Sequence, residues 1–292
     1  MSENDIKFFT PQIQMLDEVY KQASVTAVLD GNNELARMTE YGNEFQIPTY
    51  DMEGFGDYSR TTGYPKGAVT MGFETKKPNI DRARVFQVEK MDNIESAGIA
   101  FGSLSAQFVR TKAVPEIDAI RLSTYYGKAP TEAKKQATLS GGEDWIKALS
   151  TANVYMDNKE VPTENRYLFI TSDGLAAIND LDTTKSRAAL ARFAGVQIVP
   201  QTRFYSAIKL LSGSGDETAG GYTKASGAVD INFEIIHPSA LIQYTKDIVN
   251  KVINPDENQE GDWWKFFYHM YGIAEVYDNK VDGIYCHAKA AA

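Results

Sequence analysis

Three carboxylates lie close together in the sequence, at Asp51, Glu53 and Asp57, in a stretch rich in Gly and Tyr. A glycoside hydrolase needs such a pair, one group to donate a proton and one to attack or to activate water, separated by about 5–10 Å. Sequence spacing does not supply that separation, and this composition is more typical of a solvated acidic loop. A carbohydrate-active enzyme stays open as an alternative, and we assign no catalytic residue.

Other reactive side chains are sparse. His237, His269 and His287 lack the paired spacing of a metal-binding helix, and one cysteine, Cys286, excludes an internal disulfide and a cysteine-clustered zinc site. Gly127-Lys128 is followed by Ala129, which has no hydroxyl to hold magnesium, and the glycine-rich stretch 212–221 is acidic. We therefore expect no metal and no cofactor, and a surface loop at 212–221.

Composition narrows the class of protein. The 292 residues include 43% apolar and 24% charged residues, which is typical of a folded globular chain, and the net charge is −9. That charge argues against a dedicated nucleic-acid clamp, and no apolar run reaches the ~18 residues of a membrane span. The acidic start of the chain is unlike a secretory signal, so we expect the protein to be made in a cytosol and to have no membrane partner.

The first elements that the pattern predicts are an arm and a hairpin. Thr10-Pro11 is a typical helix start, and the residues that follow have the apolar spacing of a short amphipathic helix to about residue 23. Residues 41–66 indicate an extended, turn-rich segment. Two alternating runs then flank the sequence Lys76-Lys77-Pro78-Asn79, which predicts a long β-hairpin over about residues 69–88. Its apolar face requires cover from outside the hairpin.

A long helix is expected next. Asp92 is a candidate cap and Glu95 completes a capping box, and an apolar stripe continues to Phe108. Pro115 predicts a kink or a restart before the helix continues to about Tyr125. The total length would be about 50 Å at 1.5 Å per residue.

The rest of the chain alternates between helices and strands, which indicates a mixed α/β domain. The expected helices are one at 143–153, one capped by Ser172 and one at 186–193. The expected strands are 167–170, 196–199 and 231–236. The C-terminal stretch is expected to form two strands, 266–274 and 283–287, linked by a polar turn at 277–280.

This order of parts, together with several short strings, resembles the major capsid proteins of tailed bacteriophages with the Hong Kong 97-like fold, of the type found in phages and prophages of Gram-positive bacteria. The strings are Asp57-Tyr58-Ser59-Arg60, Phe73-Glu74-Thr75, Asp92-Asn93-Ile94-Glu95-Ser96, Val114-Pro115-Glu116-Ile117-Asp118 and the run from Val276 to Tyr285. The resemblance covers about residues 5–289.

The resemblance implies an α+β fold in four parts. These are an N-terminal arm (1–40), an extended loop and β-hairpin or E-loop (41–91), a P-domain with the spine helix and a β-sheet (92–126 and 238–292), and an A-domain (127–237). It also implies a subunit that assembles into hexamers and pentamers of an icosahedral or prolate shell around phage double-stranded DNA. An encapsulin-like nanocompartment shell and a virion accessory that binds sugars or receptors are further alternatives.

The implied partners are other copies of the chain, a separate scaffolding protein, a portal and passively held DNA, and the implied location is the virion capsid after assembly in the bacterial cytoplasm. We expect the hairpin to supply the subunit interface through its apolar face and its arginines, which would pair with Glu74, Glu89 or Glu95. The candidate interface residues are Arg60, Val69, Met71, Phe73, Glu74, Arg82, Arg84, Phe86 and Val88. Lys66, Lys76 and Lys77 are available for a crosslink, but lysines at a turn are usually solubilising.

Overall fold

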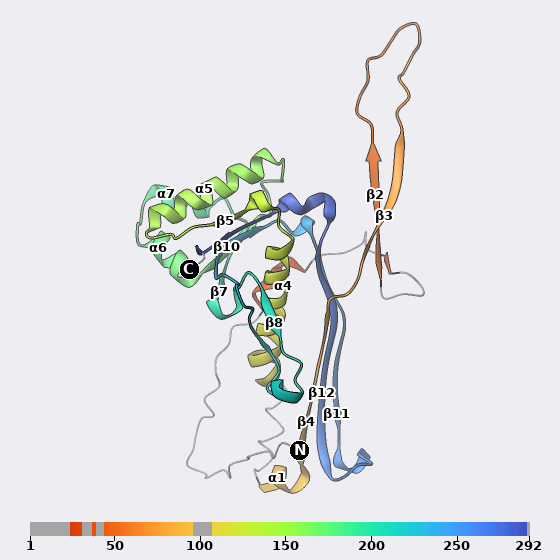
Figure 1. The fold of residues 1–292 in the computed structure, drawn as a ribbon, viewed down its shortest axis with the longest axis vertical. Helices are drawn as coiled ribbons and strands as arrows, with labels where there is room; N and C mark the ends of the chain where they lie inside the picture. The colour runs from red at the N-terminus through yellow and green to blue at the C-terminus, as the bar shows by residue number, and fades with distance from the viewer. Residues whose placement is uncertain (1–23, 31–36, 39–43, 96–106, 291–292) are drawn as a thin grey trace. The chain divides into compact units, whose positions relative to one another are not determined.

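The computed structural model describes residues 24–30, 37–38, 44–95 and 107–290 (Figure 1). The chain divides into two compact units, a smaller one of residues 32–79 and a larger one that joins residues 1–31 to residues 80–292. The helix expected from Thr10 to about residue 23 lies outside the described residues. Within the described ranges, no helix has both the length and the apolar character needed to cross a bilayer.

The smaller unit is a three-stranded antiparallel sheet. Its strands, in the order β1-β2-β3, are β1 (Arg37–Met38), β2 (Phe45–Met52) and β3 (Val69–Lys76). β2 and β3 form a long hairpin, with Phe45 opposite Lys76 at one end and Met52 opposite Val69 at the other (Figure 1). Residues 53–68 connect the two strands.

The predicted pairing of this hairpin is wrong. Residues 69–76 and 80–89 are both strands, as their alternation indicates, but β3 pairs with β2, whereas β4 (Ile80–Glu89) pairs with β12 in the larger unit. Residues 77–79 therefore link two sheets instead of closing a turn. Alternation fixes which residues share a face of a strand, but it carries no information about which strand lies alongside.

A five-stranded mixed sheet forms the core of the larger unit. Its strands, in the order β5-β13-β10-β6-β7, are β5 (Lys134–Gln136), β13 (Ile284–Ala288), β10 (Ile231–Ile236), β6 (Tyr167–Thr171) and β7 (Gly195–Val199). β10 is antiparallel to both neighbours, while β6–β7 and β13–β5 are parallel. All six residues of the central strand β10 are buried, as expected for a strand covered on both faces.

Helices cover both faces of this sheet. One face packs against α5 (Gly142–Asn158), α6 (Ser172–Asn179) and α7 (Thr184–Leu190), with Trp145, Leu149 and Met156 of α5 in the core. The other face packs against α4 (Val114–Lys128), whose Leu122 and Tyr125 are fully buried. The expected α/β domain is present, but Thr171 and not Ser172 caps α6, because the Thr171 hydroxyl accepts the N–H of Gly174.

The second sheet of the larger unit has the order β11-β12-β4, with β11 (Leu241–Ile253) and β12 (Trp263–Val276). The two C-terminal strands expected at 266–274 and 283–287 exist as β12 and β13, but they belong to different sheets. The register of β11 shifts between Thr245 and Asp247, opposite Gly272. A Cβ on Gly272 would lie 2.8 Å from the Tyr244 carbonyl oxygen, so this irregularity requires a glycine.

Helical segments follow β4. α1 (Lys90–Glu95) begins two residues before the expected cap, because a Glu89 carboxylate oxygen accepts the N–H groups of Met91 (2.6 Å) and Asp92 (3.2 Å). Residues 96–106, which contain part of the predicted apolar stripe, lie outside the described residues. A π-helical turn, η2 (Val109–Ala113), then leads directly into α4, and the helix passes through Pro115 without a break. The wider π turn accommodates the missing N–H of proline.

A small hairpin of β8 (Ile208–Leu210) and β9 (Tyr222–Lys224) extends from the larger unit. Its connection contains the glycine-rich stretch 212–221. Near the N-terminus of the described chain, the 3-10 helix η1 (Val25–Leu29) packs into the core next to α4, with Val25 and Leu29 buried.

Candidate subunit interface

One face of the β2–β3 hairpin is apolar and exposed. Tyr50 and Met52 of β2 lie opposite Met71 and Val69 of β3, and Phe73 follows on the same face. Cross-strand neighbours on one face lie within side-chain contact, so these five residues form a continuous patch. Their exposed fractions range from 53% for Met71 to 67% for Met52. We call this patch, Tyr50, Met52, Val69, Met71 and Phe73, the hairpin face.

The opposite face of the hairpin carries an ion pair beside the buried Ile47, which lies opposite Glu74. Glu74 pairs with Lys76 at 2.8 Å, and both side chains are about one-tenth exposed. Lys77 pairs with Glu44 at 3.0 Å. Glu74 is therefore engaged within its own strand, and two of the three lysines considered for a crosslink hold ion pairs. Lys66 is exposed in the connection 53–68.

The connection between β2 and β3 holds the three carboxylates considered for catalysis. Glu53 closes the loop, because its Oε2 accepts the N–H of Ala68 at 3.1 Å. Asp51 and Asp57 are exposed, as are the apolar side chains of Phe55 and Tyr64. Nothing in this geometry buries a carboxyl group, so it lacks the environment that usually prepares a general acid. Among the described residues, no group of His, Cys, Asp and Glu is arranged to hold a metal ion.

Phe86 and Val88 are not on the hairpin face. Phe86 lies opposite Phe266 in the sheet, with ring centroids 6.2 Å apart, and Phe108 packs edge-on against it at 4.8 Å. Val88 is only 7% exposed. Phe86 packs against Phe108 at the start of the long helix of its own chain, and the assignment of Phe86 and Val88 to a subunit interface stays a prediction.

Arg82 and Arg84 also have partners within the chain. Arg82 forms an ion pair with Glu116 of α4, and it donates to the carbonyl oxygens of Leu211 (2.9 Å) and Gly221 (3.3 Å). Arg84 donates to the carbonyl oxygens of Gly213 (3.4 Å) and Thr218 (3.0 Å). The two arginines fasten the glycine-rich loop to β4 within the chain, and their expected intersubunit role stays a prediction. Arg60 is exposed.

The histidines have structural surroundings. The ring of His237 accepts the N–H of Ser239, and His287 is buried, 3.0 Å from the amide of Asn232 and stacked on Phe233. Burial lowers the pKa of His287 to about 4, so this ring is neutral at pH 7. His269 contacts Asp81 at 2.8 Å on an exposed part of the sheet.

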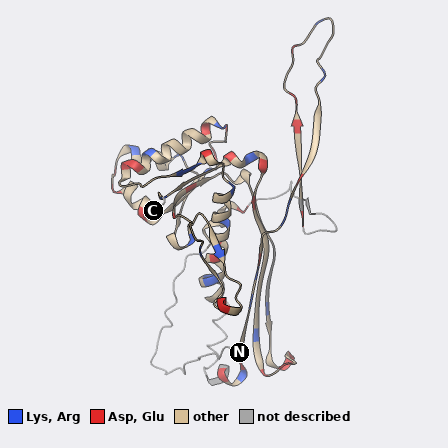
Figure 2. Ribbon diagram, viewed as in Figure 1, with Lys and Arg blue, Asp and Glu red and all other residues tan. Residues whose placement is uncertain are grey.

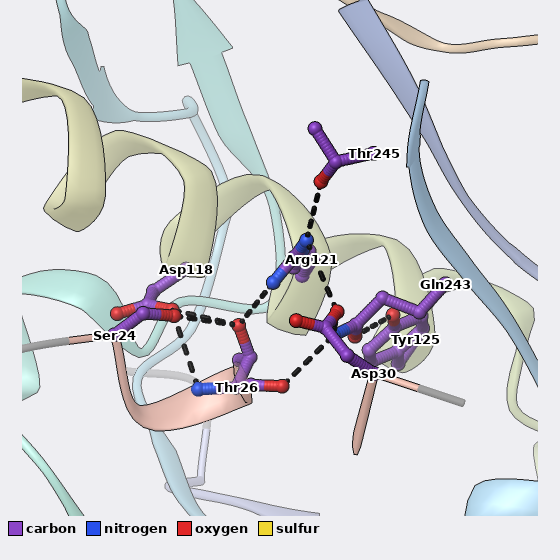
Figure 3. A network of polar contacts seen from close by, with 8 residues as sticks. All are labelled: Ser24, Thr26, Asp30, Asp118, Arg121, Tyr125, Gln243 and Thr245. Atoms are coloured by element: carbon purple, nitrogen blue, oxygen red, sulfur yellow. Dashed lines mark hydrogen bonds and ion pairs between the residues drawn. The ribbon is translucent and has the colours of Figure 1, made fainter. Parts of the chain in front are cut away.

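A buried polar network joins the N-terminal segment to α4 (Figure 3). Asp118 is fully buried and accepts the hydroxyl groups of Ser24 and Thr26, each at 2.7 Å, and it pairs with Arg203 at 2.9 Å. Arg121, one turn further along the helix, donates to the Thr26 hydroxyl at 3.0 Å.

The same network extends to β11. Gln243 donates to the Thr26 carbonyl oxygen (2.8 Å) and to Asp30 (2.6 Å), and it accepts the hydroxyl of Tyr125 (Figure 3). This network is not among the sites predicted from the sequence. The feature of the sequence that points to it is the presence of Asp118 and Arg121 in a mainly apolar stretch of helix, because charged side chains are rarely buried without partners.

Charges are mixed along the chain. Figure 2 shows acidic and basic residues interspersed along the ribbon of the described helices and strands. Many basic groups also hold carboxylates, as Lys224 holds Asp230 (2.7 Å) and Arg192 holds Asp157 (2.9 Å).

No protein-family model matches the sequence, and a comparison with curated proteins also finds no match. Solved structures do match over nearly the whole chain. The capsid structure of the cyanophage P-SCSP1u has a TM-score of 0.66 at 13% identity, over 99% of this chain and 94% of that one. A Mycobacterium phage Che8 structure has a TM-score of 0.62 at 15% identity, over 98% of both chains.

A virus-like particle from Pyrococcus furiosus is similar over 84% of this chain and 86% of that one, with a TM-score of 0.52 and 13% identity. The architecture is therefore that of phage capsid proteins. The chain has the Hong Kong 97-like fold, as the sequence resemblance predicts.

Proposed function

We propose that this protein is the major capsid protein of a tailed bacteriophage or prophage, assembling as hexamers and pentamers into an icosahedral or prolate shell around double-stranded DNA. The observation that carries the proposal is the likeness to phage capsid chains over essentially its whole length. The hairpin face adds independent support, because a patch of five exposed apolar residues on one face of a sheet gains stability by burial against a partner.

The proposed domain boundaries follow the four parts that the resemblance implies, with one change. Residues 1–40 would form the N-terminal arm, 127–237 the A-domain, and 92–126 with 238–292 the P-domain. The E-loop would end at residue 79 instead of 91, because β4 is a strand of the same sheet as β11 and β12. In this proposal the hairpin face of each subunit lies on a neighbouring copy.

The proposed partners are further copies of the chain, a separate scaffolding protein, a portal and the packaged DNA. The net charge of −9 and the mixing of charges in Figure 2 favour a shell that confines DNA without binding it tightly. The proposed location is the virion, after assembly in the host cytoplasm.

A nanocompartment shell is the second candidate, and the likeness to the Pyrococcus particle favours it. The hydrolase alternative gains nothing from the described structure, since the carboxylates considered for it are exposed or close a loop.

Electron microscopy of the purified protein tests the proposal, alone and after coexpression with the neighbouring structural genes of its source. Closed shells or rings of five and six subunits are expected. Uniform small shells that enclose a co-purifying enzyme would favour the nanocompartment, and a protein that stays monomeric at every concentration and in every coexpression would contradict both shell hypotheses.

A further inference from the structure

A groove of about 760 Å³ lies within the larger unit, between the beginning of the long helix, the β11-β12-β4 sheet and the glycine-rich loop. Its floor is apolar and mainly aromatic, with Phe86, Phe108, Tyr268 and Met270 among the lining residues. Grooves of this size and composition are typical binding sites for one face of a peptide or helix.

The outer wall of the groove is fixed in place. Arg82 and Arg84 hold loop 211–221 through four carbonyl contacts. Gly213 has a φ of 74°, a backbone conformation that favours glycine, and its carbonyl oxygen accepts a hydrogen bond from Arg84 at 3.4 Å. The groove is therefore preformed and does not depend on a ligand to shape it.

The rim carries an excess of positive charge. The lining includes four basic residues, Arg82, Arg84, Lys112 and Lys224, and one acidic residue, Glu116. Glu116 pairs with Arg82, and Lys224 pairs with Asp230. Arg84 contacts carbonyl oxygens and Lys112 is exposed, so neither cation has a carboxylate partner among the described residues. An occupant with carboxylates beside an apolar face would suit this rim.

The N-terminal segment joins the described structure beside this groove. Ser24 is hydrogen-bonded to Asp118 on α4, immediately after the groove-lining residues Glu116 and Ile117. Arg203, which pairs with the same Asp118, is adjacent in sequence to the groove-lining Thr202. The 23 residues that precede Ser24 are therefore joined to the described structure next to the groove, and they belong to the same unit of the chain.

The sequence of that segment matches the groove in both properties. Ile13, Leu16 and Tyr20 have the spacing of one helix face, and Asp17 and Glu18 provide carboxylates between them. A helix over residues 10–23 would be about 21 Å long. We propose that residues 10–23 of the same chain bind in this groove, with the apolar stripe on Phe86 and Phe108 and the carboxylates near Arg84 and Lys112.

The covalent link to Ser24 favours residues 10–23 over a second copy of the chain as the occupant of the groove. A segment linked directly to the edge of its site has an effective concentration in the millimolar range, so a free partner at micromolar concentration competes poorly. The consequence is that an unassembled subunit covers the aromatic groove with its own arm. The hairpin face, by contrast, has no such tethered cover among the described residues.

Hydrogen–deuterium exchange on the unassembled subunit tests this binding. The full chain is compared with a variant that lacks residues 2–22, at a concentration where both are unassembled. The deletion is expected to speed exchange at least fivefold in residues 107–117 and 212–222, while the buried strand β10 is unchanged and reports on folding. A synthetic peptide of residues 10–23, added to the deletion variant, should restore the protection.

An exchange of charge between Lys112 and Glu18 tests whether these two side chains are in contact. Lys112→Glu and Glu18→Lys should each speed exchange around the groove, and the double variant should recover part of the protection. Lys135→Glu, at an exposed position of β5, is the matched control and should have no effect. Exchange that is unaffected by the deletion would overturn the proposal. Protection that increases with protein concentration would overturn it too, by assigning the groove to a second copy. Because the readout precedes assembly, neither result bears on whether the protein forms a shell.

Discussion

Two fully buried carboxyl groups in the larger unit have opposite surroundings. Asp118 is surrounded by donors, namely two hydroxyl groups, two backbone N–H groups and the guanidinium of Arg203. Glu234, in the central strand β10, has one weak donor, the thiol of Cys286 at 3.6 Å, and its Oε2 has no partner among the described residues. Desolvation therefore raises the pKa of Glu234 well above its usual value.

Within the described part of the chain, no cation offsets this effect at the Glu234 carboxyl. The titratable groups that face it are Cys286 of β13 and Tyr125 and Tyr126 of α4, and burial raises the pKa of Cys286 and of Tyr126 as well. The charge of Lys134 acts to lower the pKa of Cys286, but the Lys134 ammonium donates its hydrogen bond to the Gly127 carbonyl oxygen. Glu234 is consequently a neutral hydrogen-bonding group in the folded protein over a range of pH in which the unfolded chain carries it as a carboxylate.

This difference predicts a pH dependence of stability. The folded state holds the Glu234 proton above pH 4.5 and the unfolded state does not, so the free energy of unfolding falls as pH rises from about 4.5 toward the raised pKa. Glu234→Gln removes that ionisation. The melting temperature of the variant, relative to the natural protein, should increase between pH 5 and pH 8, by about 2–4 °C for each kcal/mol involved.

The comparison is made by thermal melts of both proteins across that pH range, with Glu132→Gln as the control, because Glu132 is exposed in an ion pair with Lys159. Parallel curves for Glu234→Gln and the natural protein would show that the carboxyl group does not titrate differently on folding.

At the scale of elements, the arginines of β4 connect parts that are far apart in the sequence. Arg82 joins β4 to α4 through Glu116 and to the loop after β8 through two carbonyl oxygens. A side chain that donates to three acceptors in a partly buried position is difficult to replace, because its removal takes a donor away from the Glu116 carboxylate and the Leu211 carbonyl oxygen, while Gly221 keeps the N–H of Leu211.

Arg82→Ala should therefore lower the melting temperature and expose the glycine-rich loop. We expect a loss of about 1–3 kcal/mol in the free energy of unfolding, and faster cleavage by a protease within residues 212–221. Arg60→Ala is the matched control, because Arg60 is exposed in the smaller unit. Equal effects of the two substitutions on melting and on cleavage would contradict the anchoring role of Arg82.

At the scale of the whole molecule, the two units differ in how they bury apolar surface. The larger unit covers its five-stranded sheet with its own helices, whereas the smaller unit leaves the hairpin face exposed. Substitutions in the two places should consequently separate folding from assembly.

The double variant Met71→Asp with Phe73→Asp should fold with a melting temperature close to that of the natural protein, since both side chains are more than half exposed. It should fail to form shells or rings in electron micrographs, because the charged residues oppose burial against a neighbour. Phe86→Ala is the contrasting variant and should destabilise the subunit by about 3 kcal/mol. Normal particles from the double variant would exclude the hairpin face as an assembly surface.

Local pattern determined much of this protein. Alternation identified β3 and β4, a short apolar run identified β6, and helical spacing identified α4 and α5. The same alternation placed Val69, Met71 and Phe73 on one face, which is exposed. β2 was expected only as part of an extended, turn-rich segment, from its Gly, Tyr, Thr and Asp composition.

Tertiary structure alone decided which elements meet. β4 pairs with a strand about 180 residues later, Arg82 binds a loop about 130 residues later, and Asp118 meets Ser24 and Arg203 from opposite directions along the chain. The sequence determines the period of each element and which of its faces is apolar, because these depend on neighbouring residues. Which partner covers that face depends on the summed contacts of distant segments, and for this reason Phe86 packs partly buried against Phe108 and Phe266 while Phe73 remains exposed.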